Sequence, residues 1–173
     1  MPIISIDGAE LDLPRNLALL DTNVLVAIGD DRDNDHEQAM LVFEELSEYQ
    51  FGVTPPVILE TLGMLTSRRG RETAIRMAQW ILTPGNVIVL PALHPPTATS
   101  DVIGIHVHSM NKFSIDFVDS HLMHAADLLT SSWSLKPHAP IVTFDTKDFF
   151  KCAPAGYLYS LYDMRELDLV VFA

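Results

Sequence analysis

Cysteine, basic residues and long apolar runs are scarce in this sequence, and each scarcity excludes a class of protein. The 173 residues include one cysteine, Cys152, which excludes an internal disulfide and fits a reducing compartment. No apolar run approaches the ~18 residues that predict a membrane span. The N-terminus lacks a basic segment followed by an apolar stretch, so no secretory signal is expected. We therefore expect a cytoplasmic protein without a membrane partner.

The shortage of basic residues limits nucleic-acid binding. The chain has 11 Lys and Arg against 23 Asp and Glu, a net charge of −12. Proteins that bind nucleic acid mainly through phosphates are usually basic, so extended nonspecific binding is not expected. Four basic residues nevertheless fall in one stretch: Arg68, Arg69, Arg71 and Arg76. This stretch is either a solvated helix face or a patch that contacts phosphates.

Composition and patterning predict one soluble α/β domain over residues 1–173, because 48% of the residues are hydrophobic, 20% are charged, and no repeat or low-complexity linker is visible. A hairpin is expected around Asp7-Gly8, and a variant capping box, Asn34 with Glu37, is expected to open a helix. Further strands are predicted at 17–20, 51–54, 87–90 and 141–144, and further helices at 55–65, 72–82, 100–110 and 115–129. This alternation favours a parallel sheet, in which ligands bind beyond the carboxyl ends of the strands.

Four carboxylates stand almost alone beside or inside apolar stretches. Asp21 and Asp145 each close an apolar run of strand length. Glu60 is the only charged residue of the helix expected over 55–65, and Asp119 lies inside an apolar helical pattern. Burying a carboxylate costs free energy unless it is paired or binds a cation. Only Asp145 has a basic residue within a few positions, so a metal ion is a candidate partner for the set.

The ligand type indicates which metal to expect. Asp116 lies one turn before Asp119, on the flank of the same helix face. A buried carboxylate cluster repels itself and raises its own pKa values unless a cation is present. Oxygen ligands without a Cys or His cluster favour a hard ion, so Mg²⁺ or Mn²⁺ is expected.

Four segments that carry these carboxylates resemble, in order, the four motifs of PIN-domain nucleases. They are Leu19–Leu25, Pro55–Glu60, Phe117–Leu122 and Val142–Asp145. The resemblance covers about residues 17–150 and leaves residues 1–16 and 152–173 as extensions. Its closest form is the stand-alone VapC-type toxin of toxin–antitoxin pairs. It implies a three-layer α/β/α fold with a central parallel sheet, and a metal-dependent endoribonuclease whose acidic quartet is Asp21, Glu60, Asp119 and Asp145.

The implied chemistry assigns expected roles and partners. One or two metal ions held by the quartet would acidify a water and hold the scissile phosphate in line with it. Thr22, Asn23, Thr143 and Asp116 are expected to orient these carboxylates. The arginine stretch becomes a tentative RNA contact. An RNA substrate, a small antitoxin and a second copy of the chain are the expected partners. The apolar C-terminal extension either completes the sheet edge or forms an interface.

Alternatives remain open from the sequence alone. Asp21 and Asp145 could begin turns, and surface or flank positions are favoured for Asp116 and Asp148, although both could reach the site. A zinc site at His106/His108 and His121/His124 lacks a matching Cys or His set, so packing or surface histidines are favoured. A Mg²⁺-dependent phosphatase of the haloacid dehalogenase type requires an acid at the position of Asn23. A PIN-like domain in RNA processing, or one kept as an idle scaffold, is the remaining reading.

Overall fold

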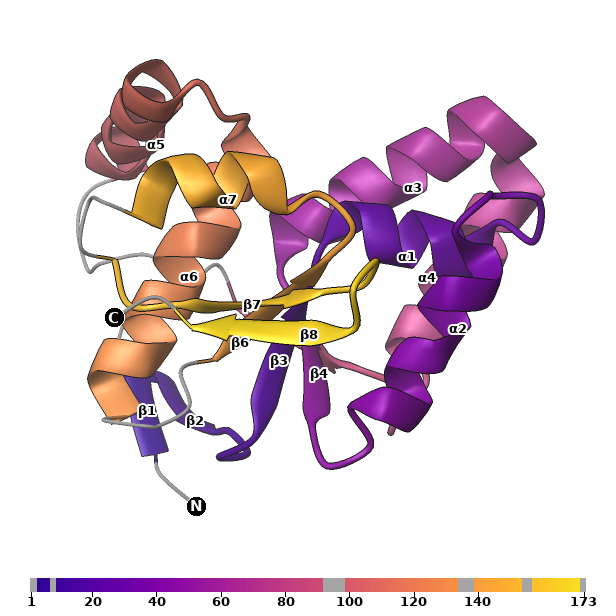
Figure 1. The fold of residues 1–173 in the computed structure, drawn as a ribbon, viewed down its shortest axis with the longest axis horizontal. Helices are drawn as coiled ribbons and strands as arrows, with labels where there is room; N and C mark the ends of the chain where they lie inside the picture. The colour runs from indigo at the N-terminus through magenta and orange to yellow at the C-terminus, as the bar shows by residue number, and fades with distance from the viewer. Residues whose placement is uncertain (1–2, 7–8, 92–98, 134–138, 154–156, 172–173) are drawn as a thin grey trace.

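A six-stranded sheet forms the centre of the protein, in the order β5-β4-β3-β6-β7-β8 (Figure 1). The computed structural model describes residues 3–6, 9–91, 99–133, 139–153 and 157–171. The strands are β3 (Leu17–Leu20), β4 (Gln50–Val53), β5 (Ile88–Val89), β6 (Pro140–Thr143), β7 (Ser160–Asp163) and β8 (Asp168–Val171). The first five are parallel to their neighbours, and β8 pairs antiparallel with β7. The sheet expected as parallel is therefore mixed at one edge.

Two groups of helices flank this sheet. They are α1 (Thr22–Gly29), α2 (His36–Glu45), α3 (Pro55–Arg69) and α4 (Arg71–Leu82) in one group, and α5 (Thr99–Phe113), α6 (Phe117–Trp133) and α7 (Thr146–Cys152) in the other. Figure 1 shows the first group on one side of the strands and the second on the other. This arrangement confirms the expected three-layer α/β/α fold. Among the described residues, no helix has both the length and the apolar character needed to cross a membrane.

A short N-terminal hairpin stands apart from the main sheet. Strands β1 (Ile3–Ile6) and β2 (Ala9–Asp12) pair antiparallel, as the sequence predicted. The Asp7-Gly8 turn itself lies outside the described residues.

The core lies between the sheet and both helix layers. All four residues of β3 are buried, as expected for a central strand covered on both faces. Close packing reaches the backbone at Gly52 on β4, where an added Cβ would stand 2.9 Å from Cδ1 of Leu90. Gly70 has φ 88° and separates α3 from α4, a conformation that favours glycine. These contacts fix the strands whose ends carry the candidate site.

Three local expectations need correction or completion. The capping box at Asn34 is wrong, because α2 begins after Asp35 and no side chain bonds its first turn. Helix α1 was not predicted, although it follows directly from β3. The C-terminal extension contributes β7 and β8, so it completes one edge of the sheet.

Candidate active site

Asp21 lies at the carboxyl end of β3, where it caps the N-terminus of α1. Its side chain is buried, with 4% exposed. Oδ1 accepts a hydrogen bond from the Thr22 amide at 2.6 Å. Oδ2 accepts from the Asn23 side-chain amide and from the Thr143 hydroxyl, both at 2.7 Å. Three donors therefore hold both carboxylate oxygens in a fixed orientation.

Asp145 follows the neighbouring strand at the same edge of the sheet. The register pairs Leu20 of β3 with Val142 of β6, so the residues after both strands meet there. The Asp145 amide donates to Thr143 Oγ1 at 3.0 Å, and its Oδ1 accepts from the Lys147 amide at 3.2 Å, which caps α7. The chain leaves β3 toward β4 on one side and returns through β6 on the other. Ligands of such sheets bind at this switch point.

Glu60 reaches the same place from α3. Its Oε2 accepts a hydrogen bond from the Thr22 hydroxyl at 2.7 Å, while the Thr22 amide donates to Asp21. One threonine thus contacts both carboxylates. The helix of Glu60 is less enclosed than its sequence suggested, because Leu59 is 73% exposed.

Asp119 lies in the first turn of α6, half-buried, and its amide donates to Oδ1 of Asp116 at 2.9 Å. Burial, followed by the charges of Asp21, Asp116, Asp148 and Asp145, raises the pKa of Asp119 to about 8. The carboxylates around Asp119 therefore outweigh the Lys151 ammonium, whose own pKa the charge of Asp119 helps to raise.

The pKa of Asp21 is also raised, to about 6. Burial is the main cause, the hydrogen bonds from Thr143 and Thr22 oppose it, and the charges of Asp116 and Glu60 add to it. The two raised pKa values show that the side chains lie within electrostatic reach of one another. The structure therefore brings together all four carboxylates that stood out in the sequence.

Two further carboxylates belong to this neighbourhood. Asp116 accepts the α6 amide of Asp119 and raises the pKa of both Asp21 and Asp119. Asp148 on α7 raises the pKa of Asp119 and pairs with the Lys151 ammonium, which also donates to the Ser114 carbonyl at 3.3 Å. Asp116, which directly precedes α6, and Asp148, in the first turn of α7, therefore lie beside the site, although the sequence favoured surface or flank positions for both.

The donor set fits a hard divalent cation. All its atoms are carboxylate oxygens, and their mutual repulsion would be relieved by positive charge. Hydrogen bonds from Thr22, Asn23 and Thr143 orient two of the carboxylates in the way that metal ligands are usually supported. In the described part of the chain, no three His, Cys, Asp or Glu side chains already converge on one point at ligand distances. The structure therefore shows four carboxylates as candidate ligands, and the hydroxyl and amide groups that orient two of them.

Comparison with known proteins assigns the family. The sequence model of the PIN domain matches residues 18–153, which run from β3 to the end of α7. This chain belongs to the PIN-domain family. No curated protein sequence matches it.

Three solved structures share this PIN-domain fold. VapC20 of Mycobacterium tuberculosis, described as a toxin that cleaves the sarcin–ricin loop, is 18% identical with a TM-score of 0.57, over 82% of this chain and 96% of its own. FitAcB of Neisseria gonorrhoeae is 15% identical with a TM-score of 0.55, over 87% and 99%. VapBC-1 of nontypeable Haemophilus influenzae is 16% identical with a TM-score of 0.54, over 86% and 98%. At these identities the likeness shows the fold.

The arginine stretch of this PIN domain is partly engaged within the chain. Nε of Arg69 donates to both oxygens of Asp30, at 2.6 and 2.7 Å, and Arg68 pairs with Asp33 at 3.2 Å. Arg76 donates to the Thr73 hydroxyl at 3.1 Å. Two of the four tentative RNA contacts therefore serve the acidic loop after α1, and an RNA role for the stretch stays a prediction.

Three histidines of the considered zinc site, His106, His121 and His124, pack α5 against α6, whereas His108 is exposed. Nδ1 of His106 lies 2.9 Å from Oγ of Ser120, and Nε2 of His124 lies 3.1 Å from Oγ of Ser109. The ring of His106 lies 5.5 Å from that of His121 and 5.3 Å from that of His124, measured between centroids. Polar contacts to serines and ring packing account for these side chains.

One functional candidate escaped the sequence. Arg165, in the turn between β7 and β8, donates from Nε to the Phe144 carbonyl at 3.1 Å, next to Asp145. Arg165 lies far along the chain from every motif, so the sequence did not mark it as a site residue. The pairing of β7 with β6 brings it to the site, and the prediction that the C-terminal extension could complete the sheet edge was the feature that could have indicated this.

Proposed function

We propose that this PIN domain is a Mg²⁺- or Mn²⁺-dependent endoribonuclease, and that it acts as the toxin of a toxin–antitoxin pair. One observation supports the proposal: four carboxylates from separate elements lie around the carboxyl ends of β3 and β6, where burial and mutual charge raise the pKa of Asp21 to about 6 and of Asp119 to about 8. Such a cluster is costly to keep without a cation. The description of VapC20 as a toxin that cleaves RNA supports the finer assignment.

The residues take distinct roles in this proposal. Asp21, Asp119 and Asp145 would hold the metal, and Glu60 would face them from α3. Bound Mg²⁺ or Mn²⁺, as one ion or two, supplies positive charge for the scissile phosphate and a more acidic water. The donors on Asp21 favour its ionised form, which is the form that binds a cation. Thr22 donates to both carboxylates and so fixes the position of Glu60 relative to Asp21.

RNA cleavage with and without Mn²⁺ tests the activity. We expect Asp119→Asn to lower the rate more than about 100-fold, because the loss of a ligand should exceed the 10- to 100-fold cost of losing a ligand's support. Asp31→Asn is the matched control, since Asp31 is an exposed aspartate outside the four motifs. Full activity in Asp119→Asn would remove the nuclease assignment.

A phosphatase assay on the same samples separates the enzyme classes. In the structure, the Asn23 amide donates to Asp21, whereas a phosphatase of the haloacid dehalogenase type needs an acid at that position. We therefore expect no hydrolysis of a phosphate monoester under conditions that allow RNA cleavage. Absence of both activities would favour an idle binding scaffold.

The proposed protein partner is a small antitoxin with an arginine-bearing segment. A net charge of −12 and the acidic site favour a basic partner, and the forked donors of arginine suit carboxylates. The chain is also proposed to form a homodimer. Co-expression with the product of the adjacent gene, followed by size-exclusion chromatography, tests both points. A monomer that harms no cells and captures no small protein would contradict the toxin assignment and leave the nuclease assignment standing.

A further inference from the structure

The β7–β8 hairpin lies outside the segment matched by the PIN-domain model, yet its turn reaches the acidic site. The match ends at residue 153, and the hairpin begins at Ser160. Strand β7 runs parallel to β6, with Thr143 opposite Asp163. The residues that follow both strands therefore lie at the same edge of the sheet. Arg165 is the second residue after β7.

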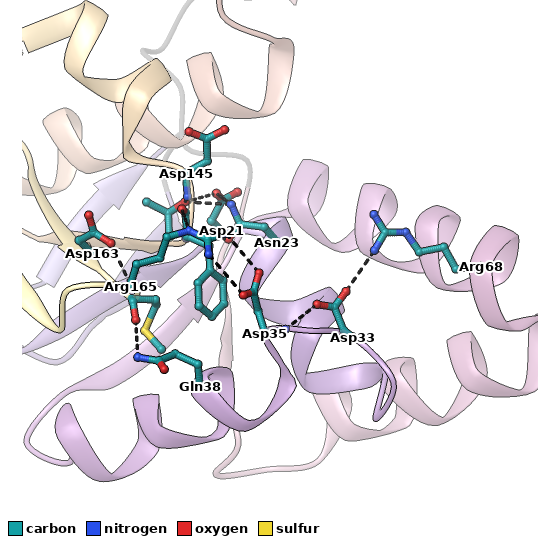
Figure 2. Close-up of polar contacts among 12 residues, drawn as sticks. Asp21, Asn23, Asp33, Asp35, Gln38, Arg68, Asp145, Asp163 and Arg165 are labelled. Atoms are coloured by element: carbon teal, nitrogen blue, oxygen red, sulfur yellow. Dashed lines mark hydrogen bonds and ion pairs between the residues drawn. The ribbon is translucent and has the colours of Figure 1, made fainter.

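Arg165 makes three kinds of contact, two of them with Phe144 in the loop after β6. Its Nε donates to the Phe144 carbonyl at 3.1 Å, and its guanidinium carbon lies 5.6 Å from the centre of the Phe144 ring. Its terminal nitrogens stand 3.3 and 3.5 Å from the Asp35 carboxylate. Figure 2 shows Arg165 beside Asp35 and close to Asp21, Asn23 and Asp145. The hairpin is thus tied both to α2 and to the site.

The Phe144 carbonyl and the Asp145 amide belong to one planar peptide group. Arg165 binds the oxygen of this group, and Thr143 Oγ1 binds its N–H at 3.0 Å. The same Thr143 hydroxyl donates to Asp21 at 2.7 Å. The preceding amide, that of Phe144, donates to Oδ1 of Asn23 at 3.1 Å. Both edges of the peptide that carries Asp145 are therefore held, and one of them is held through the group that orients Asp21.

We propose that Arg165 is a positioning residue for the acidic site: by binding the Phe144 carbonyl, it fixes the peptide that places Asp145 and keeps the Thr143 hydroxyl on Asp21. This inference rests on the proposed metal-dependent function. Carboxylates that bind one cation must be held in a narrow geometry, so a free rotation of this peptide weakens both binding and catalysis.

Two rival roles for Arg165 predict different outcomes. As a simple cation near the carboxylates, Arg165 repels a metal ion, so its removal would leave metal affinity unchanged or tighter. As an RNA contact, it would affect KM rather than kcat. As a positioning residue, its removal weakens metal binding and lowers kcat while KM stays nearly constant.

The hairpin offers a matched control for plain destabilisation. The side-chain amide of Gln38 donates to the Met164 carbonyl at 2.7 Å, which anchors the same turn to α2 without touching Phe144. Gln38→Ala therefore loosens the hairpin and spares the peptide at the site. Arg165→Lys keeps a charged donor that can return to the Phe144 carbonyl.

The experiment measures Mn²⁺ affinity by titration calorimetry, together with kcat and KM for RNA cleavage. For Arg165→Ala we expect Mn²⁺ affinity to fall at least fivefold and kcat about tenfold, a loss comparable with other residues that orient metal ligands, with KM within about twofold. Arg165→Lys should recover part of both losses, and Gln38→Ala should keep both values close to wild type. If Arg165→Ala does not fold, Arg165→Met replaces it, because methionine keeps the packing on Phe144 and removes the donor.

Three results would overturn the proposal: unchanged or tighter Mn²⁺ binding in Arg165→Ala, a higher KM with unchanged kcat, or equal losses in Gln38→Ala. Amide hydrogen exchange at Asp145 gives a readout that needs no activity. It should be at least tenfold faster in Arg165→Ala than in Gln38→Ala, and equal rates would refute the positioning role. A wild-type protein that neither binds Mn²⁺ nor cleaves RNA would instead refute the proposed function, and the exchange rates would still decide the role of Arg165.

Discussion

The two ends of helix α1 carry two buried aspartates with opposite electrostatics. Asp21 caps the N-terminus of the helix and is 4% exposed, and Asp30 follows its C-terminus and is 3% exposed. Burial raises the pKa of Asp21 to about 6, with further contributions from other carboxylates. Burial acts on the pKa of Asp30 in the same direction, but the hydrogen bonds and charge of Arg69 outweigh it and lower the pKa.

These two aspartates differ in their hydrogen-bond donors, because only Asp30 has a cationic one. Asp30 accepts two hydrogen bonds from Nε of Arg69 and a third from the Arg32 amide, whereas Asp21 accepts only from uncharged donors. Asp21 also lies deeper in the protein, so one end of the helix carries a satisfied ion pair and the other carries a buried carboxylate without a cationic hydrogen-bond donor. Arg69 supplies a positive charge at Asp30, and the metal ion proposed above would supply one at Asp21.

The prediction with the largest expected effect removes Arg69, the cation that pairs with Asp30 at the C-terminal end of α1. Arg69→Gln should leave Asp30 buried without its partner and lower the free energy of unfolding by about 3 kcal/mol, the typical cost of breaking a buried pair. The pKa of Asp30 should rise, as it does at Asp21. Urea unfolding measures the first change, and NMR titration of the Asp30 carboxyl measures the second.

Arg68→Gln is the control for this change. Arg68 pairs with Asp33 in the same loop, but 48% of the Arg68 side chain is exposed, so its loss should cost no more than about 1 kcal/mol. Equal effects of the two substitutions would show that the contrast between the ends of α1 does not depend on the buried pair.

Sequence patterns predicted the parts of this molecule that local chemistry determines. The run Leu17–Leu20 is a buried central strand, and the pattern after Asp116 is the long helix α6. Helix α1 escaped because Thr22–Gly29 is apolar almost all round, so a period of 3.6 residues is not visible. The aspartate that ends β3 and caps α1 was the available signal.

Contacts between distant segments could not be predicted in the same way. The bond between Thr22 and Glu60 depends on the crossing of α1 and α3, and that between Arg165 and Phe144 depends on the pairing of β6 with β7. Neither follows from spacing in the chain. The sequence could therefore indicate which carboxylates belong to the site, while the residues that hold them required the tertiary structure.

A second prediction concerns how the stability of the protein depends on pH through Asp119 and Asp21, the carboxylates with raised pKa values. The pKa of Asp119 is about 8 in the folded protein and ordinary in the unfolded chain, so its contribution to stability is fully present below about pH 4 and is lost as the pH rises through 8. Asp21 acts in the same direction through pH 6. Between pH 6 and pH 8 the metal-free protein should lose about 2–3 kcal/mol, or about 4–12 °C in melting temperature.

Asp119→Asn isolates this effect, because asparagine cannot ionise. Burial lowers the pKa of His124, which acts in the opposite direction below pH 6.5, and this contribution cancels in the difference between the two proteins. The variant should melt at or above the wild-type temperature at pH 8, and the difference should shrink as the pH falls. A difference that does not depend on pH would show that Asp119 is not an uncompensated carboxylate.

The prediction with the smallest expected effect concerns the stabilisation of the protein by added Mn²⁺ and its dependence on Asp21. Mn²⁺ at ten times its dissociation constant should stabilise the wild type by about 1.4 kcal/mol through mass action. Asp21→Asn should respond less, because it lacks the best-oriented ligand of the set.

Asp33→Asn is the control for the loss of one negative charge. Asp33 belongs to the loop that pairs with Arg68, so this variant should respond to Mn²⁺ as the wild type does. Thermal unfolding with and without Mn²⁺ measures all three. Equal shifts in the wild type and Asp21→Asn would place the ion elsewhere, and a reduced shift in Asp33→Asn would place it in the acidic loop after α1, where Arg69 already supplies the positive charge.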